Sequence, residues 1–171
     1  HATKLPLGDE VQVGATILRD GHETLRAVVR WKTAEGDWWE TPMLADPGTD
    51  RWSAAITPDA LGTTTFQIEA WTDPFASWRH EMQRRIDGGQ QDLSSELLEG
   101  AALLRSTKAT GADRIALRDV AGAVASQRPQ DERITIALSV DVATLVGRST
   151  ARPERTRSQP HQIEVDPVRA T

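Results

Sequence analysis

Tryptophan is the residue type in this chain with the clearest capacity for binding chemistry. The sequence holds six Trp and two Phe, all between residues 31 and 78. The face of a Trp ring stacks on the apolar face of a sugar ring or on a base. Trp38 and Trp39 are neighbours, and neighbouring side chains of a strand point to opposite faces, so both cannot enter one core. We therefore expect at least one of them on an outer face, either covered by a neighbouring domain or binding carbohydrate.

The residue types that usually carry catalysis or bind metals form no recognisable motif. The chain has no Cys, and His1, His22, His80 and His161 lack the spacings of metal ligands such as H-x-H or H-E-x-x-H. The nucleophile elbow, the P-loop and the dinucleotide fingerprint are missing, and Gly88-Gly89 follows a predicted helix that it would end. A glycosidase carboxylate pair is defined by separation in space, so the sequence nominates none. We predict no catalytic residue, metal site or cofactor in this chain.

The length of the chain limits its possible folds, and its net charge limits its possible partners. The chain has 171 residues, shorter than the roughly 250 of a (β/α)₈ barrel. Its 20 Lys and Arg against 25 Asp and Glu give a net charge of −5, so we expect neither nucleic acid nor an anionic membrane as a partner. No apolar run approaches the roughly 18 residues of a membrane span. The missing cysteines favour a reducing compartment, and we expect a cytoplasmic protein.

The first half of the chain has the period of half-buried antiparallel strands. Apolar residues alternate with polar or smaller ones, and turn signals separate the runs. The runs are Val11 to Ile17, Leu25 to Trp31, Trp52 to Ile56 and Phe66 to Ala70, and the turns are Arg19–His22, Ala34–Asp37, Asp46–Asp50 and Thr57–Gly62. The pattern predicts an immunoglobulin-like β-sandwich over residues 1–71, with Trp31, Trp52 and Trp71 as core candidates.

Residues 72–128 change to the period of a helix, which predicts a small helical insertion of about three helices. The first has the stripe Phe75, Trp78, Met82 and Ile86 and ends at Gly88-Gly89. The second covers about 92–107, Gly111 closes that region, and the third covers about 113–126. The fold class is therefore mainly β with an α insertion.

The strand-to-helix junction is rich in residues with side-chain functions. It contains Trp71, Asp73, Pro74, Trp78, Arg79 and His80. Asp73 suits the N-cap and Pro74 the first turn. We expect a structural corner with Trp71 and Trp78 largely buried, and a direct role in ligand binding is the alternative.

The tail divides into a connector over 129–158 and a returning strand within 159–171. Ile134 to Leu138 fits either a strand or a helix that continues to Leu145. Residues 148–157 hold four Arg against Glu154, an excess of +3, and form either a solvated connector or a basic docking patch. Gln162 to Val165 alternates again, which would return the chain to the sandwich.

Several ordered segments resemble a known family. Phe66-Gln67-Ile68-Glu69-Ala70-Trp71, Asp73-Pro74 and Trp78-Arg79-His80 resemble the N-terminal domain of bacterial α-1,4-glucan:maltose-1-phosphate maltosyltransferases of the α-amylase superfamily. Further similar segments are Gly8 to Val11 with Ala15, Arg19 to Glu23, Thr57-Pro58-Asp59, Glu96 to Ala101 and Thr156-Arg157-Ser158. The resemblance covers nearly the whole chain and ends at about Val165-Asp166. Residues 139–150 fit it loosely.

The resemblance implies a β-sandwich with a helical insertion, placed before a catalytic barrel and contributing to a homodimer interface. The parent enzyme would move maltosyl units from α-maltose 1-phosphate to α-1,4-glucans. The reaction would retain the anomeric configuration and would need no metal. Its catalytic carboxylates belong to the barrel, so no catalytic residue is transferred to this chain. The partners implied are the barrel of the same parent chain, a second copy and an α-glucan.

Two functional hypotheses follow. The chain is either a non-catalytic accessory and dimerisation domain cut from a maltosyltransferase, or an autonomous glucan-binding module that uses exposed Trp38 and Trp39.

Overall fold

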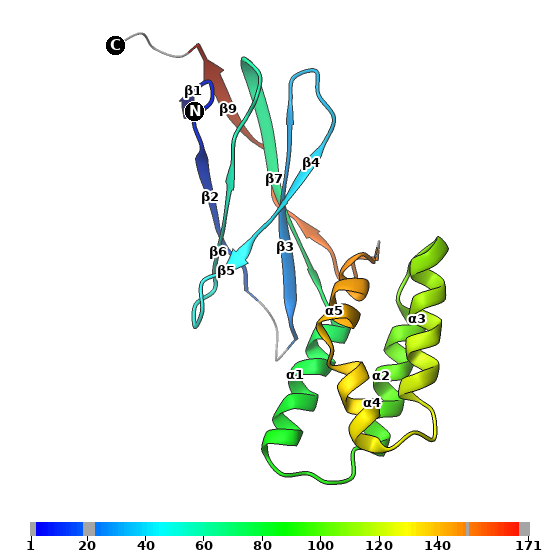
Figure 1. Cartoon of the computed structure of the whole chain (residues 1–171). Helices are drawn as coiled ribbons and strands as arrows, with labels where there is room; N and C mark the ends of the chain where they lie inside the picture. Colours follow the sequence, from blue (N-terminus) through cyan, green and yellow to red (C-terminus); the bar gives the residue numbers. More distant parts are fainter. Residues whose placement is uncertain (1–2, 19–22, 150, 168–171) are drawn as a thin grey trace. The chain divides into compact units, whose positions relative to one another are not determined.

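The computed structural model describes residues 3–18, 23–149 and 151–167. These described residues contain nine strands and five helices (Figure 1). The strands are Thr3–Pro6 (β1), Val11–Thr16 (β2), Leu25–Thr33 (β3), Trp39–Pro42 (β4), Leu44–Ala45 (β5), Arg51–Ile56 (β6), Gly62–Thr72 (β7), Thr156–Arg157 (β8) and His161–Asp166 (β9). The helices are Pro74–Asp87 (α1), Ser94–Ser106 (α2), Gly111–Val124 (α3), Gln130–Ala137 (α4) and Val140–Gly147 (α5).

The chain divides into two compact units. A β unit comprises the described residues of 1–21, 25–72 and 154–171, and a helical unit those of 22–24 and 73–153. The structure is thus a mixed α/β fold, and its sheet-rich β unit is consistent with the expected mainly β class with a helical insertion. The predicted turn at Arg19–His22 lies outside the described residues.

Two sheets form the β unit. The first has the strand order β1-β9-β7-β3-β4, with β8 also paired to β7, and the second has the order β2-β6-β5. β1 pairs with β9 in parallel, whereas the pairs that β7 makes with β3, β8 and β9 are antiparallel. After the helices, the chain therefore returns to the same sheet, where β9 pairs with β7. The helices are inserted in the sequence between these two neighbouring strands.

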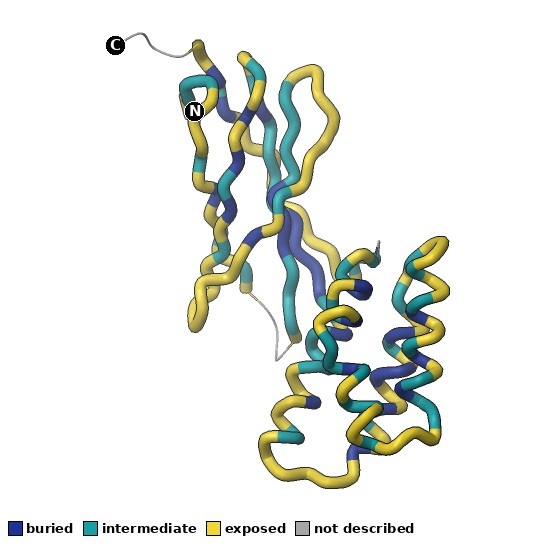
Figure 2. The backbone as a smooth tube through the Cα atoms, in the orientation of Figure 1, coloured by how far each residue is buried: buried dark blue, intermediate teal, exposed yellow. Residues whose placement is uncertain are grey.

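Alternation along the strands builds one apolar cluster from both sheets. The first sheet contributes Val29, Ile163 and Val165, and the second contributes Val13 and Ile56. All five side chains are at most 4% exposed. Figure 2 shows these stretches of buried backbone within the strands. The period of two in the sequence thus identified the faces that form this core.

The strands that the sequence did not predict are short. β1 and β4 have four residues each, and β5 and β8 have two. Such segments are too brief for a period to be recognised, and neighbouring strands determine their pairing. The Asp46–Asp50 turn is present, with Gly48 at a φ of +74°, a conformation that glycine adopts without steric cost.

The helical unit has its own apolar core. In α1, Phe75, Trp78 and Met82 are at most 7% exposed, as the helical stripe predicted. The other members are Leu93, Leu97, Ala101, Leu104, Leu117, Ala121, Val124, Ala137, Val142, Leu145 and Val146. Gly88 caps the end of α1, as the glycine pair predicted.

Residues 72–128 contain the three helices expected there, α1, α2 and α3, but the helical unit as described has five helices, so the expected total is too low. α4 and α5 occupy more than half of the 129–158 segment, and the strand alternative for Ile134 to Leu138 is wrong. Ala137 is completely buried in the core shared with α1, α2 and α3, and this packing outweighs the β-branched Ile and Thr. Gly111 is the first residue of α3 and does not close the preceding segment.

Candidate functional site

Trp39 is an exposed aromatic side chain that stacks on a second tryptophan, Trp31. It opens β4 directly opposite Trp31 of β3. The two rings stack with centroids 6.4 Å apart, and Trp39 is 61% exposed. The indole Nε1 of Trp31 donates a hydrogen bond to Thr41 Oγ1 over 3.1 Å, and this bond holds the Trp31 ring in place. The pair can therefore offer one aromatic surface to a ligand or a protein partner.

Trp38 has a different environment. It is 40% exposed, so both tryptophans are exposed, consistent with the expectation that they cannot enter one core. The guanidinium carbon of Arg30 lies 4.6 Å from the centre of a Trp38 ring, and Lys32 Nζ lies 5.1 Å from it. These cation–π contacts place two charged groups over the ring, where a sugar would otherwise stack. Trp38 is thus less available for stacking than Trp39.

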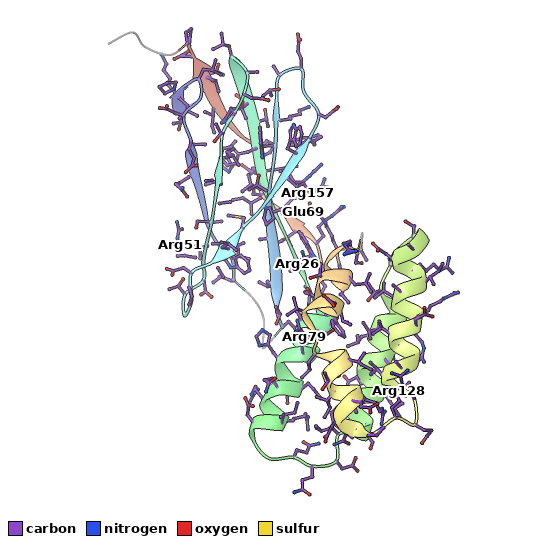
Figure 3. The ribbon with its side chains drawn as sticks, in the orientation of Figure 1. Arg26, Arg51, Glu69, Arg79, Arg128 and Arg157 are labelled. Carbon is purple, nitrogen blue, oxygen red and sulfur yellow. The ribbon has the colours of Figure 1, made fainter. Side chains whose placement is uncertain are left out.

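Glu69 is a buried charged residue of the sheet that contains β3 and β7, and sequence reasoning missed it. It lies on β7 with 1% exposure. Its carboxylate oxygens lie 3.2 Å from Arg155 Nε, 3.2 Å from Arg157 Nε and 3.9 Å from Arg30 Nε. Figure 3 shows Glu69 and Arg157 side by side. A buried carboxylate requires this kind of pairing to offset its lost hydration.

The arginine-rich segment is therefore anchored within the chain. Arg155 and Arg157 pair with Glu69, and Arg148 NH1 lies 3.2 Å from Asp113 Oδ1. Ser158 exchanges hydrogen bonds with the backbone of Ile68, which fixes the segment beside β7. These contacts favour the connector over the basic docking patch. The signal in the sequence was a single charged residue on β7 and a distant run of Arg, with no spacing to connect them.

Trp71, Asp73 and Pro74 of the junction have structural positions. Asp73 caps α1, because its Oδ1 accepts a hydrogen bond from the backbone N–H of Ala76 over 3.0 Å, and Pro74 opens the helix. Trp71 is 6% exposed and lies under the Arg26 guanidinium, 5.6 Å from its ring centre. The burial of Trp71 and Trp78 that the sequence predicted is confirmed.

The other junction side chains make local contacts. Trp78 Nε1 donates a hydrogen bond to the carbonyl of Glu96 over 2.9 Å. The Arg79 guanidinium donates to the carbonyl of Leu138 over 2.9 Å and ties α1 to the end of α4, whereas His80 is exposed. These local contacts are of a structural kind, and a ligand-binding role for these residues stays a hypothesis.

Neither a metal-binding cluster nor a transmembrane helix is present among the described residues. No group of three or more His, Asp or Glu in the described ranges is placed to hold a metal ion. None of the helices described is both long enough and apolar enough to span a membrane. His161 stacks on Phe66 with ring centroids 5.2 Å apart, and His1 and His22 lie outside the described residues.

Comparison with known proteins gives a consistent result. A family model described as alpha-1,4-glucan:maltose-1-phosphate maltosyltransferase, domain N/S, matches residues 1–167. The chain is 36% identical over 175 residues to alpha-1,4-glucan:maltose-1-phosphate maltosyltransferase 2 of Streptomyces coelicolor, covering 98% of this chain and 26% of that protein. It is 35% identical over 187 residues to the alpha-1,4-glucan:maltose-1-phosphate maltosyltransferase of Rhodospirillum rubrum, covering 99% and 27%. The chain therefore spans about a quarter of the length of these relatives.

Proposed function

This chain belongs to the family of domain N/S of the α-1,4-glucan:maltose-1-phosphate maltosyltransferases, and we propose that it is the non-catalytic accessory and dimerisation domain of such an enzyme. The observation that carries the proposal is the match over residues 1–167 to the N-terminal part of relatives about four times as long. The parent enzyme transfers maltosyl units from α-maltose 1-phosphate to α-1,4-glucans in the cytoplasm. The transfer retains the anomeric configuration and needs no cofactor. A catalytic barrel in the same parent chain carries the reaction.

Exposed apolar side chains support a role in association. Leu98 of α2, Ile115 of α3 and Val140 of α5 are 54%, 64% and 77% exposed. Large apolar residues that face solvent in a lone domain suit a surface that another subunit or domain covers. The immunoglobulin-like assignment of the β unit is likewise our interpretation of its two sheets and shared core.

An assay of phosphate release tests the proposal. The purified chain, incubated with α-maltose 1-phosphate and a maltooligosaccharide acceptor, should release no phosphate, whereas a full-length relative assayed beside it should. Sustained release that co-purifies with the 171-residue chain would refute the non-catalytic role. Sedimentation at high micromolar concentration tests association separately, and a strict monomer for both the chain and the full-length enzyme would contradict dimerisation.

The exposed Trp39–Trp31 pair favours glucan binding as a second candidate function. Maltooligosaccharides should then quench or enhance Trp fluorescence, and Trp39→Ala should abolish the response. Trp38→Ala is the matched control, because Arg30 and Lys32 already lie over that ring and its removal should leave binding nearly intact. A flat titration of the unaltered chain would eliminate this candidate.

A further inference from the structure

A pocket in the helical unit has no role in the proposed function. It lies where α2 ends, the 107–110 loop turns and α3 begins, and its volume is about 430 Å³. The floor includes Leu104 and Leu117, which are at most 2% exposed and belong to the helical core. This volume is within the range of roughly 300–1,000 Å³ that small-molecule sites occupy.

The charge of the pocket lining is entirely positive. Arg105, Lys108, Arg114 and Arg118 line it, and none of the described lining residues is acidic. Ion pairs occupy other surface arginines such as Arg84, Arg85 and Arg148. No ion pair within the described part of the chain involves any of these four cations. A protein with a net charge of −5 thus concentrates four uncompensated positive charges around one pocket.

The four cations are the charged groups that decide which ligand the pocket favours. Thr110, the N-cap residue of α3, also lines the pocket, whereas residues 111–113 of the first helical turn do not. Four positive charges without an acidic lining residue favour an anion over a neutral or cationic ligand.

We propose that this pocket binds a small molecule that carries a phosphate group. Three of the four cations are arginines, whose planar guanidinium groups match phosphate oxygens in a bidentate geometry. The concave shape favours a small anion over an extended acidic peptide, because a peptide needs a groove along which several residues can lie. The ligand would link the end of α2 to the start of α3.

Backbone NMR of the 171-residue chain tests the proposal, with inorganic pyrophosphate as the probe at low ionic strength, where screening of exposed charges is weak. We expect saturable shifts of amide signals confined to residues 104–118. The double variant Arg114→Gln/Arg118→Gln should raise the dissociation constant at least about tenfold, because it removes charge-assisted hydrogen bonds.

The matched control is Arg128→Gln. Arg128 is exposed, lies beyond the opposite end of α3 and does not line the pocket (Figure 3). This variant should bind pyrophosphate as the unaltered chain does, and the unperturbed spectrum of each variant reports that it is folded. Equal weakening by Arg128→Gln, or no saturable shift up to about 10 mM pyrophosphate, would overturn the proposal. Tighter binding of a poly-glutamate peptide at the same amides would overturn it too, since the surface would then be a docking site for acidic protein.

Discussion

At the scale of single residues, Gly100 of α2 packs closely against the ring of Trp78. A Cβ built on Gly100 would clash with Cζ2 of Trp78, a buried side chain whose Nε1 is already hydrogen-bonded. Gly100→Ala should therefore destabilise the helical unit by about 1–3 kcal/mol, despite the better helix propensity of alanine. Chemical denaturation measures the change.

Gly122→Ala is the control for this prediction. Gly122 lies within α3, and its added Cβ would meet nothing within 4 Å. The substitution should leave stability unchanged or raise it by up to about 1 kcal/mol. If both variants are equally stable, Trp78 moves easily and the close packing of α2 is not a constraint.

Glu69 and its arginines should respond unequally to substitution. Glu69→Gln removes a charge from a 1% exposed position and leaves three arginines without it, so we expect a loss of about 1–3 kcal/mol. Arg155→Gln should cost less than about 1 kcal/mol, since Arg155 is 51% exposed and Arg157 still pairs with Glu69. Thermal unfolding measures the stability of the two variants. A larger loss of stability for Arg155→Gln than for Glu69→Gln would contradict the central position of Glu69 in this cluster.

At the scale of the elements, the start of α2 depends on Asp92. Its Oδ1 accepts hydrogen bonds from Ser94 Oγ over 2.6 Å and from the Ser94 backbone N–H over 3.0 Å. These bonds hold the pKa of Asp92 below its ordinary value of 3.8. Because the folded pKa is depressed, the contribution to stability is present above the unfolded pKa and is lost as pH falls through the folded one.

Ser94→Ala should raise the pKa of Asp92 toward 3.8, because the hydroxyl is the larger cause of the shift. Ser95→Ala is the control, since Ser95 is the next residue of the same helical turn and is not a cause of the shift. An NMR titration of the Asp92 carboxyl measures both. An identical pKa in all three proteins would show that Ser94 does not stabilise this helix start.

The long elements were predictable because their periods extend over several residues. β2, β3, β6 and β7 alternate clearly, and the α1 stripe from Phe75 to Met82 identified a helix. The sequence did not determine α4, because its Ile134-Thr135-Ile136 segment has strand propensity and a core distant in sequence decides its structure. Alternation predicted that at least one of Trp38 and Trp39 is exposed, but it did not predict which one. The Glu69 cluster joins residues 39 to 88 positions apart, and no local pattern indicates it.

At the scale of the whole molecule, the helical segment enters and leaves the β unit at adjacent points. β7 ends at Thr72, and β8 pairs with it through Ala70 and Thr156. Thr72 Oγ1 donates a hydrogen bond to Glu154 Oε2 over 3.0 Å. Since the two chain ends of the β unit already meet here, a short loop can replace the helices between them.

We therefore predict that a variant with residues 73–153 replaced by a short Gly/Ser linker folds. The β core draws on residues 5–70 and 163–165 and includes no side chain from the helices. The variant should show dispersed amide signals and one cooperative unfolding transition, and the separate 73–153 segment should be helical because its core is equally self-contained. A control that deletes residues 161–167 instead should not fold, because it removes β9, which lies between β1 and β7, together with the buried Ile163 and Val165. A disordered spectrum for the 73–153 replacement would mean that the β unit needs the helices to fold, and the insertion would then be a structural requirement of the sheet.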